Sequence, residues 1–219
     1  MVEFKPQGIP ARNVRVWVDP DTANVLDGPI IFYWHGTGGS PQEVAVGLGE
    51  LAIQEILDAG GMVVAPTSDP MAGLFPWHLV TGAKHDDLLV ADEVIACAHA
   101  QFTMDPRRIH SIGFSAGGIH TAHMSIRRSS YIASVVPFSG GLVLGAMPQF
   151  RDPETKLAAM IFHGGPNDVV VVGFKQASED YANYLKMAGH FPIVCDHGGG
   201  HTVPNVGENV LQFLHEHPF

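Results

Sequence analysis

Short apolar runs alternate with longer amphipathic stretches along this chain of 219 residues. The apolar runs are rich in β-branched residues and have the length of buried strands; they lie at 14–18, 30–34, 62–65, 109–112, 132–137, 158–162 and 191–195. The amphipathic stretches have helical length and lie at 41–59, 86–101, 117–128, 174–189 and 205–217. Strands that alternate with helices form crossover units, so the pattern predicts an α/β fold with a mainly parallel sheet flanked by helices.

The composition fits one domain. Hydrophobic residues make up 46% of the chain, which is enough to bury a large core, and we find no internal repeat or linker-like shift in composition. The longest aperiodic segment after the fourth predicted strand is 139–156, which leaves little room for a lid. We therefore expect a single domain over 1–219 with a minimal lid or none.

The charge and the cysteine content limit the possible binding partners and cellular compartments of the protein. The net charge is −10 and only 16% of the residues are charged, which argues against binding to nucleic acid or to an anionic membrane. No export signal is evident, so the sequence as it stands predicts a cytoplasmic protein; a secreted protein whose signal had been removed would look the same. The two cysteines, Cys97 and Cys195, are most simply two buried thiols, with a single disulfide as the alternative. The sequence carries no signal for the oligomeric state.

A Gly-x-Ser-x-Gly motif follows the predicted strand at 109–112. It runs from Gly113 to Gly117 and has Ser115 at its centre. This is the pattern of a nucleophile elbow, in which the serine sits on a strained turn between a strand and a helix. Glycines on both sides allow the strand and the helix to approach closely. We therefore take Ser115 as the candidate nucleophile.

A serine hydroxyl needs a base within hydrogen-bonding reach and a carboxylate that orients that base. Asp168 lies in a turn after the predicted strand 158–162, and His201 lies in a glycine-rich loop after the last predicted strand. These two residues are the preferred acid and base. His197 is the main alternative base among 13 histidines. The alternative acids are Asp69, Asp92 and Asp196.

Acyl transfer also needs hydrogen-bond donors for the oxyanion. The backbone N–H of Ala116, at the start of the helix after the elbow, is one candidate. The glycine-rich turn 35–40 follows a strand, and the N–H of Thr37 in that turn is the other. The turn lacks the Gly-Lys-Ser/Thr ending of a phosphate loop, and no His-Glu-x-x-His or paired-cysteine spacing is present. We therefore expect neither a cofactor nor a metal.

Five residues are candidates for substrate binding because their segments are expected to rim the site, although apolar residues in such loops are as often plain packing. They are Phe75, Trp77, Met147, Phe150 and Val170. Their apolar character fits a small-molecule or oligomeric ester.

Taken together, the motifs resemble the α/β-hydrolase superfamily, and within it the polyhydroxybutyrate-depolymerase and feruloyl-esterase group. The motifs that carry the resemblance are His35-Gly-Thr, the aromatic segment around Trp77, Asp105-Pro-Arg-Arg-Ile leading into Gly-Phe-Ser115-Ala-Gly-Gly, His163-Gly-Gly-Pro-Asn-Asp168, and Gly200-His201-Thr-Val-Pro. The resemblance implies that Ser115 is the nucleophile, Asp168 the acid and His201 the base. It also implies that Thr37 and Ala116 form the oxyanion hole.

The function predicted from these residues is that of a serine carboxylic-ester hydrolase. It would act through an acyl-enzyme on short-chain, aryl or polyester-type esters. A thioesterase or serine peptidase would use the same residues, and a non-catalytic binding protein with a hydrolase fold is the alternative outside enzymes.

Overall fold

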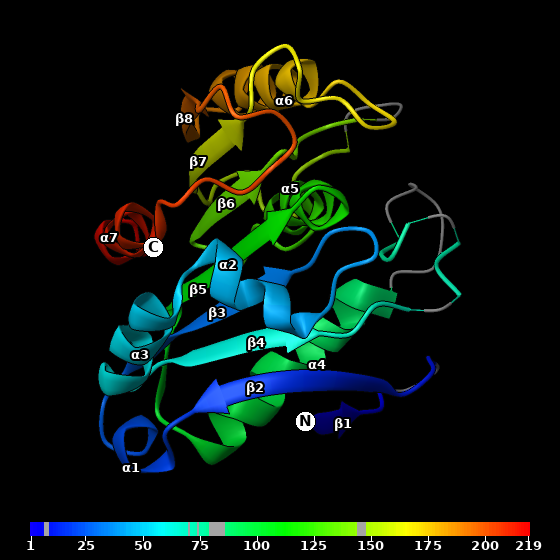
Figure 1. Cartoon of the computed structure of the whole chain (residues 1–219). Coiled ribbons are helices and arrows are strands. Elements are labelled where there is room, and N and C mark those ends of the chain that lie inside the picture. The colour runs from blue at the N-terminus through cyan, green and yellow to red at the C-terminus, as the bar shows by residue number, and fades with distance from the viewer. Residues whose placement is uncertain (7–8, 70, 74, 79–85, 144–147) are drawn as a thin grey trace.

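A computed structural model describes residues 1–6, 9–69, 71–73, 75–78, 86–143 and 148–219 of the chain. These residues form an eight-stranded sheet with the order β1-β2-β4-β3-β5-β6-β7-β8 (Figure 1). The strands are β1 (Val2–Phe4), β2 (Arg12–Val18), β3 (Gly28–Trp34), β4 (Met62–Pro66), β5 (Met104–Phe114), β6 (Ser134–Phe138), β7 (Ala158–His163) and β8 (Phe191–Asp196).

The six strands β4, β3, β5, β6, β7 and β8 are parallel to one another, while β2 is antiparallel to both β1 and β4. The prediction of a mainly parallel sheet is confirmed. All seven predicted strands are present, and β1 is added at the edge. The sequence gives little sign of β1, because three residues are too few to show a period.

Helices cover both faces of the sheet. They are α1 (Pro20–Ala23), α2 (Val44–Gly47), α3 (Glu50–Asp58), α4 (Asp86–Gln101), α5 (Ala116–Arg127), α6 (Phe174–Met187) and α7 (Gly207–Glu216), with a 3-10 turn η1 (Pro41–Glu43) before α2. The alternation of side chains along β3 separates two cores. Ile30, Phe32 and Trp34 pack with apolar residues of α4, α5 and α6, whereas Ile31 and Tyr33 pack with those of α3 and α7.

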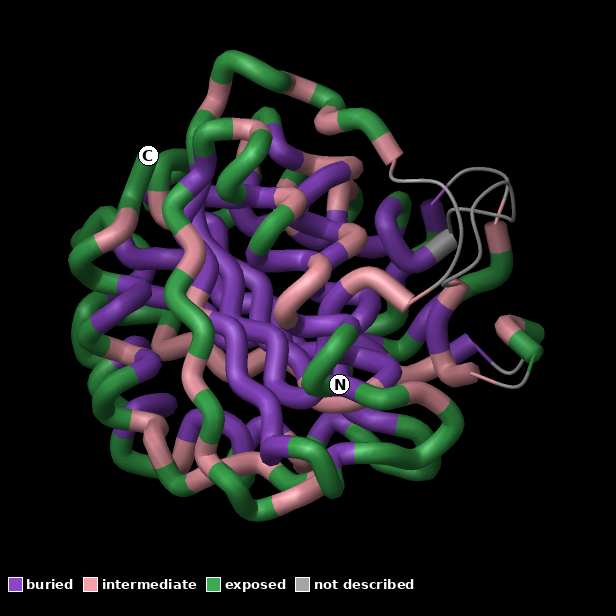
Figure 2. The backbone as a smooth tube through the Cα atoms, turned by 90° about the horizontal axis from the view of Figure 1, so that it is seen from above, coloured by how far each residue is buried: buried purple, intermediate pink, exposed green. Residues whose placement is uncertain are grey.

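The central strands are buried along their length, and exposed residues concentrate on the outer helices and loops (Figure 2). Every residue of β3 and β4 is buried. Strands buried on both faces read as continuous apolar runs, which is why their positions were readable in the sequence.

One predicted helix is wrong. The stretch 41–59 is not continuous but is divided into η1, α2 and α3. Gly49 has a φ of 83° and precedes α3, and this left-handed conformation interrupts the helical path. Gly47 also lies against the ring of Tyr33, where a Cβ atom would be 2.2 Å from a ring carbon. The amphipathic period continues through the break, so the pattern does not reveal it.

Because β3, β5, β6, β7 and β8 are parallel, the loops that follow them lie at the same edge of the sheet. The loop from β6 to β7 contains no helix or strand within its described residues 139–143 and 148–157. We call this edge the carboxyl edge and the opposite one the amino edge.

Candidate active site

Ser115 lies between β5 and α5 in a strained backbone conformation. Its φ is 57° and its ψ is −118°, a combination that residues with a side chain rarely adopt. The strained turn is held by backbone hydrogen bonds on both sides, because Ser115 N–H donates to the carbonyl of Phe138 at 2.9 Å and Ile119 N–H donates to the carbonyl of Ser115 at 2.9 Å. The side chain is half-buried at the carboxyl edge. The predicted elbow geometry is therefore present.

The glycine at 117 is required by close packing of the elbow on the end of β3. A Cβ atom at Gly117 would lie 1.7 Å from the carbonyl oxygen of Trp34, and one at Gly113 would lie 2.4 Å from the carbonyl oxygen of Gly117. No side chain fits at either position. The tight contact brings the turn after β3 directly beside Ser115.

His201 is placed between Ser115 and Asp168. Its Nε2 atom lies 3.0 Å from Ser115 Oγ, and its Nδ1 atom lies 2.7 Å from Asp168 Oδ1. An ionised carboxylate only accepts hydrogen bonds, so a proton on Nδ1 leaves Nε2 of the neutral ring to accept from the serine hydroxyl. The ring also contacts Phe174, at 4.6 Å between centroids, and Phe114, at 4.8 Å. These aromatic contacts restrict its orientation.

Asp168 is fully buried, with all of its side chain removed from solvent. A buried carboxylate is stable only when donors satisfy its oxygens. Its Oδ2 atom accepts from the backbone N–H of Gly164 and from the hydroxyl of Ser139, both at 2.8 Å, and its Oδ1 atom accepts from His201. Both oxygens are therefore used, and the carboxylate is fixed toward the imidazole.

The two loops that carry the acid and the base are joined by their backbones. Gly200 N–H donates to the carbonyl of Gly164 at 2.9 Å. A Cβ atom at Gly164 would lie 1.8 Å from the carbonyl oxygen of Gly200, so the approach requires a glycine. The close contact places His201 over Asp168 without relying on side-chain contacts alone.

The alternative residues considered from the sequence are engaged elsewhere. His197 accepts a hydrogen bond at Nδ1 from Gly199 N–H within its own loop. Asp69 pairs with Arg12, Asp92 pairs with Arg128, and Asp196 is about half exposed and accepts from Gly198 N–H. The structure thus brings together the three preferred residues rather than the alternatives.

The turn after β3 lies against the elbow. A Cβ atom at Gly36 would be 3.4 Å from the Cβ of Ser115. Thr37 follows on the exposed surface. Ala116 occupies the first position of α5, where a backbone N–H has no acceptor within the helix. The N–H of Ser115 donates to Phe138 and that of Gly36 donates to Glu43, so Ala116 in the elbow and Thr37 in the turn remain as the candidate backbone donors.

Glu43 and Trp77 hold this turn from two sides. The carboxylate of Glu43 accepts from Gly36 N–H at 3.0 Å and from the hydroxyl of Tyr33 at 3.2 Å, and burial raises the pKa of Glu43 from its ordinary value. Trp77 Nε1 donates to the carbonyl of His35 at 2.9 Å. Burial also lowers the pKa of His35, so its neutral ring donates from Nδ1 to the carbonyl of Gly36 at 2.8 Å.

The five residues proposed for substrate binding lie in different surroundings in the structure. Val170 is 61% exposed and sits two residues after Asp168. Phe75 is half-buried against the core. Trp77 is 1% exposed and packs against Trp34 and His120, so it supports the turn from beneath rather than facing solvent. Met147 lies outside the described residues.

Phe150 does not rim the site. Its ring stacks on Tyr184 and lies 4.2 Å from the ring of His190, the residue just before β8. The next residue, Arg151, donates its N–H to the carbonyl of Ile126 near the end of α5. The segment has crossed to the amino edge of the sheet, because the chain must return there to begin β7.

The sequence reasoning missed Ser139, Phe174 and Glu43. Ser139 directly follows β6, the strand between those of the nucleophile and the acid, and its φ is 43°. A polar residue at the carboxyl end of a buried strand was the available signal. Phe174 and Glu43 act through tertiary contacts, which a local sequence pattern does not predict.

Within the described residues, no group of three or more histidine, cysteine, aspartate or glutamate side chains is arranged to hold a metal. The same residues contain no helix that is both long enough and apolar enough to span a membrane. Cys97 and Cys195 are free and half-buried, which confirms two thiols and excludes the disulfide.

No protein-family model matches the chain. A curated relative is a bifunctional acetylxylan esterase/xylanase from Neocallimastix patriciarum, which is 27% identical over 197 residues. The match covers 89% of this chain but only 26% of the relative, so the chain spans about a quarter of that protein.

Solved structures resemble the chain over nearly its whole length. A thermostable esterase matches with a TM-score of 0.76 and 17% identity, over 100% of this chain and 62% of its own. A phospholipase/carboxylesterase from Dyadobacter fermentans matches with a TM-score of 0.70 and 19% identity, over 93% and 96%. The esterase PE8 matches with a TM-score of 0.67 and 21% identity, over 94% and 98%.

At these identities the likeness establishes the fold. The resemblance to the polyhydroxybutyrate-depolymerase and feruloyl-esterase group stays a prediction. The order of the strands, the elbow after β5 and the structural matches together identify the architecture as the α/β-hydrolase fold.

Proposed function

We propose that this chain hydrolyses carboxylic esters through an acyl-enzyme formed on Ser115. The observation that carries the proposal is the unbroken series of hydrogen bonds from Ser115 Oγ through His201 to the buried Asp168, at 3.0 and 2.7 Å. The esterases among the similar proteins support the same reaction class.

In the first half-reaction, Ser115 Oγ attacks the ester carbonyl carbon while His201 Nε2 takes the hydroxyl proton. The C–O bond to the alcohol then breaks, and the imidazolium returns that proton to the leaving alkoxide. In the second half-reaction, water gives a proton to His201 Nε2 and attacks the acyl carbon. The bond between the acyl carbon and Ser115 Oγ then breaks, and the imidazolium returns the proton to Oγ, which releases the carboxylic acid and restores the serine. Asp168 holds the tautomer and stabilises the imidazolium.

The backbone N–H groups of Ala116 and Thr37 would bind the oxyanion. Their positions beside Ser115 support this role, because Ala116 N–H begins α5 and the Gly36–Thr37 turn is packed against the elbow. Donors fixed before the reaction need no reorganisation when negative charge develops on the carbonyl oxygen. The hydrogen bond that Gly36 N–H donates to Glu43 and the one that Trp77 donates to the carbonyl of His35 would keep this turn rigid.

The preferred substrate would combine a short acyl group with a bulky alcohol portion. Two exposed segments flank the site, the turn at Thr37–Ser40 and the apolar loop Val169–Val171, whose valines are 56 to 70% exposed. An open surface of this kind accepts a large alcohol group. The relative that matches most of this chain is named an acetylxylan esterase, which is consistent with an acetyl ester of a polymer.

The experiment compares wild-type protein with Ser115→Ala on p-nitrophenyl acetate, butyrate and palmitate. We expect hydrolysis of the two short esters by wild-type protein and a loss of about 10³- to 10⁶-fold in kcat for the variant. A thioester and an anilide with the same acyl group separate the thioesterase and peptidase alternatives. Ester hydrolysis that survives Ser115→Ala, or no hydrolysis by wild-type protein, contradicts the proposal.

A further inference from the structure

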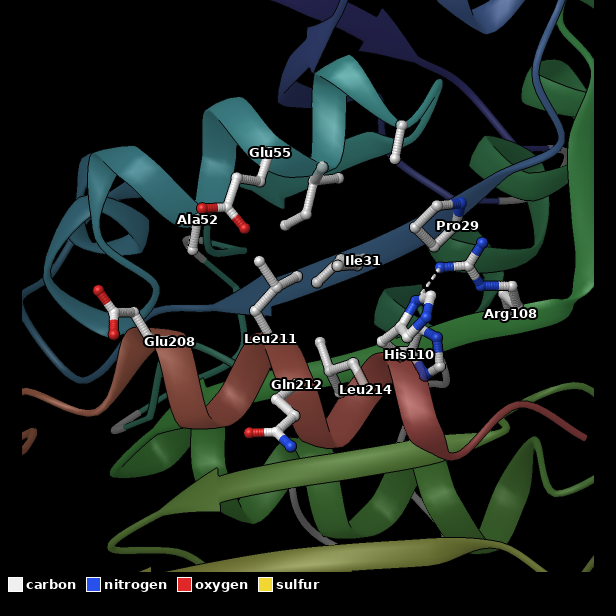
Figure 3. Close-up of a pocket in the computed structure, with 13 residues that line it drawn as sticks. Pro29, Ile31, Ala52, Glu55, Arg108, His110, Glu208, Leu211, Gln212 and Leu214 are labelled. Atoms are coloured by element: carbon white, nitrogen blue, oxygen red, sulfur yellow. Dashed lines mark hydrogen bonds between the residues drawn. The ribbon is translucent and has the colours of Figure 1, made fainter.

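A pocket of about 470 Å³ opens between α3 and α7, against Pro29 and Ile31 of β3 and Arg108 and His110 of β5 (Figure 3). It is lined by Pro29, Ile31, Ala52, Glu55, Ile56, Ala59, Arg108, His110, Glu208, Leu211, Gln212, Leu214 and His215. It shares no residue with the candidate active site. Ser115 lies five positions after His110 along the chain, which corresponds to about 17 Å of extended chain.

The volume and the walls fit a small organic molecule. Ligand pockets usually measure about 300–1,000 Å³ and have mostly apolar walls with a few polar groups that set orientation. Here the apolar side chains of Ile31, Leu211 and Leu214 lie in the middle of the pocket, between α7 and β3 (Figure 3).

The charged groups are separated along the pocket. Figure 3 shows Arg108 beside His110 at one end and the two carboxylates, Glu55 on α3 and Glu208 on α7, toward the other. The same separation follows from α7, because Glu208 lies in its first turn and His215 in its last, about 10 Å apart along the helix axis. Arg108 Nη2 lies 3.4 Å from His215 Nδ1. A ligand in this pocket therefore meets positive charge at one end only.

Arg108 forms no ion pair with any described residue. Its neighbour Arg107 takes the closest acidic side chain in the sequence, since Arg107 Nε and Nη2 each donate to Asp105 at 3.0 Å. Arg108 Nε is buried and has no protein acceptor among the described residues. A guanidinium keeps its charge and offers donors that match a carboxylate. A carboxylate, with two acceptor oxygens, would match these donors.

His110 keeps this end of the pocket free of a second charge. It is fully buried, and its Nδ1 atom lies 2.8 Å from the hydroxyl of Ser134, its cross-strand neighbour on β6. Burial lowers the pKa of His110 to about 3, so the ring is neutral near pH 7. A single guanidinium beside the neutral imidazole of His110 suits a singly charged ligand better than a phosphate or a dicarboxylate.

We propose that the pocket between α3 and α7 binds a small monocarboxylic acid, with the carboxylate on the guanidinium of Arg108 and a compact aliphatic or aromatic body between Ile31, Leu211 and Leu214. The proposal does not rest on the chemistry of Ser115, because the pocket and the candidate active site are separate.

The test is isothermal titration calorimetry with hexanoate and benzoate, and with hexanamide and benzamide as uncharged analogues. Wild-type protein is compared with Arg108→Gln, with Leu211→Trp, and with the matched control Arg107→Gln. Arg107 is the adjacent arginine, is 71% exposed at its side chain and does not line the pocket. Circular dichroism and a melting curve verify that each variant is folded.

We expect wild-type protein and Arg107→Gln to bind one of the acids with similar affinity. Arg108→Gln should weaken the acid by about 10- to 100-fold, which is the usual effect of losing a charged hydrogen-bonding partner. The amides should bind wild-type protein more weakly by a similar factor, and Leu211→Trp should remove binding by filling the pocket.

Three results would overturn the proposal. The first is that neither acid binds wild-type protein at millimolar concentration. The second is that an acid binds Arg108→Gln as tightly as wild-type protein, which would place the acid elsewhere, for example at Ser115. The third is that the amides bind as tightly as the acids, which would show that the charge has no role.

Discussion

The candidate active site at the carboxyl edge and the pocket at the amino edge differ in how their polar groups are paired. At the carboxyl edge, both oxygens of Asp168 and both ring nitrogens of His201 have protein partners. At the amino edge, Arg108 Nε and His110 Nε2 are buried without a protein partner among the described residues. The strand β5 joins the two edges, since it carries Arg108 and His110 and ends directly before Ser115.

This difference separates two kinds of site. A catalytic group works best when its hydrogen bonds are complete before substrate arrives, because nothing then has to reorganise during the reaction. A binding pocket instead keeps unpaired groups that a ligand can satisfy. Changes to the hydrogen-bonded side chains of the candidate active site should therefore affect turnover, and changes to the unpaired groups of the pocket should affect stability and ligand binding.

The largest effect should come from the imidazole at the carboxyl edge. His201→Ala should reduce kcat on p-nitrophenyl acetate by about 10³-fold or more, because the base is lost. His197→Ala is the matched control from the same loop and should stay within a few-fold of wild-type protein. Steady-state kinetics at pH 8 would decide between them, and the reverse ranking would assign the base to His197.

The second largest effect should come from the close packing of the elbow at Gly117. Gly117→Ala places a Cβ atom 1.7 Å from the carbonyl oxygen of Trp34, so we expect a loss of about 3 kcal/mol or more in the free energy of unfolding. Gly173→Ala, before α6, is the control, because a Cβ atom there meets nothing within 4 Å. Urea denaturation of both variants measures the difference. Equal stability would show that the elbow can relax.

At the amino edge, the buried side chain of His110 should make the free energy of unfolding depend on pH. The pKa of His110 is lowered by burial to about 3 in the folded chain, against 6.5 for an ordinary histidine. Between these values the unfolded chain binds the proton and the folded chain does not, so this histidine makes stability fall as pH drops below about 6.5. The slope from one such group is about 1.4 kcal/mol per pH unit.

His110→Asn removes that titration and should flatten the acid limb by about 2 kcal/mol between pH 7 and pH 5. His215→Asn, which changes an exposed histidine on the rim of the same pocket, is the control. Urea denaturation at pH 7, 6 and 5 gives the slopes. The same slope in wild-type protein and His110→Asn would contradict the account.

The smallest effect should come from the positioning residue Ser139. Ser139→Ala removes one of the two hydrogen bonds to Asp168 Oδ2, and we expect about a 10-fold lower kcat with KM nearly unchanged. Ser178→Ala is the control, since the hydroxyl of Ser178 donates to the carbonyl of Gly140 and not to Asp168. A change in KM alone would indicate that Ser139 binds substrate instead.

The sequence predicted the parts of this molecule that depend on local pattern. Ser115 was found because the elbow needs glycines at fixed positions, and Asp168 and His201 were found because each follows an apolar run of strand length. Ser139 and Phe174 were missed because their roles depend on contacts across the fold. Phe150 was misplaced because composition does not say toward which edge a loop runs.

The pocket at the amino edge could not be predicted from the sequence for a similar reason. Arg108 and His110 read as ordinary positions of a strand, and α3 and α7 are far apart in the sequence. Only the packed structure shows that Arg108 lacks an ion-pair partner among the described residues.

The most direct test of the central claim, that the hydroxyl of Ser115 is an activated nucleophile, is labelling with a fluorophosphonate probe followed by peptide mapping. We expect one probe on Ser115 per chain in wild-type protein, none in Ser115→Ala and strongly reduced labelling in His201→Ala. Absence of labelling in folded wild-type protein, or labelling that persists in Ser115→Ala, would contradict the account.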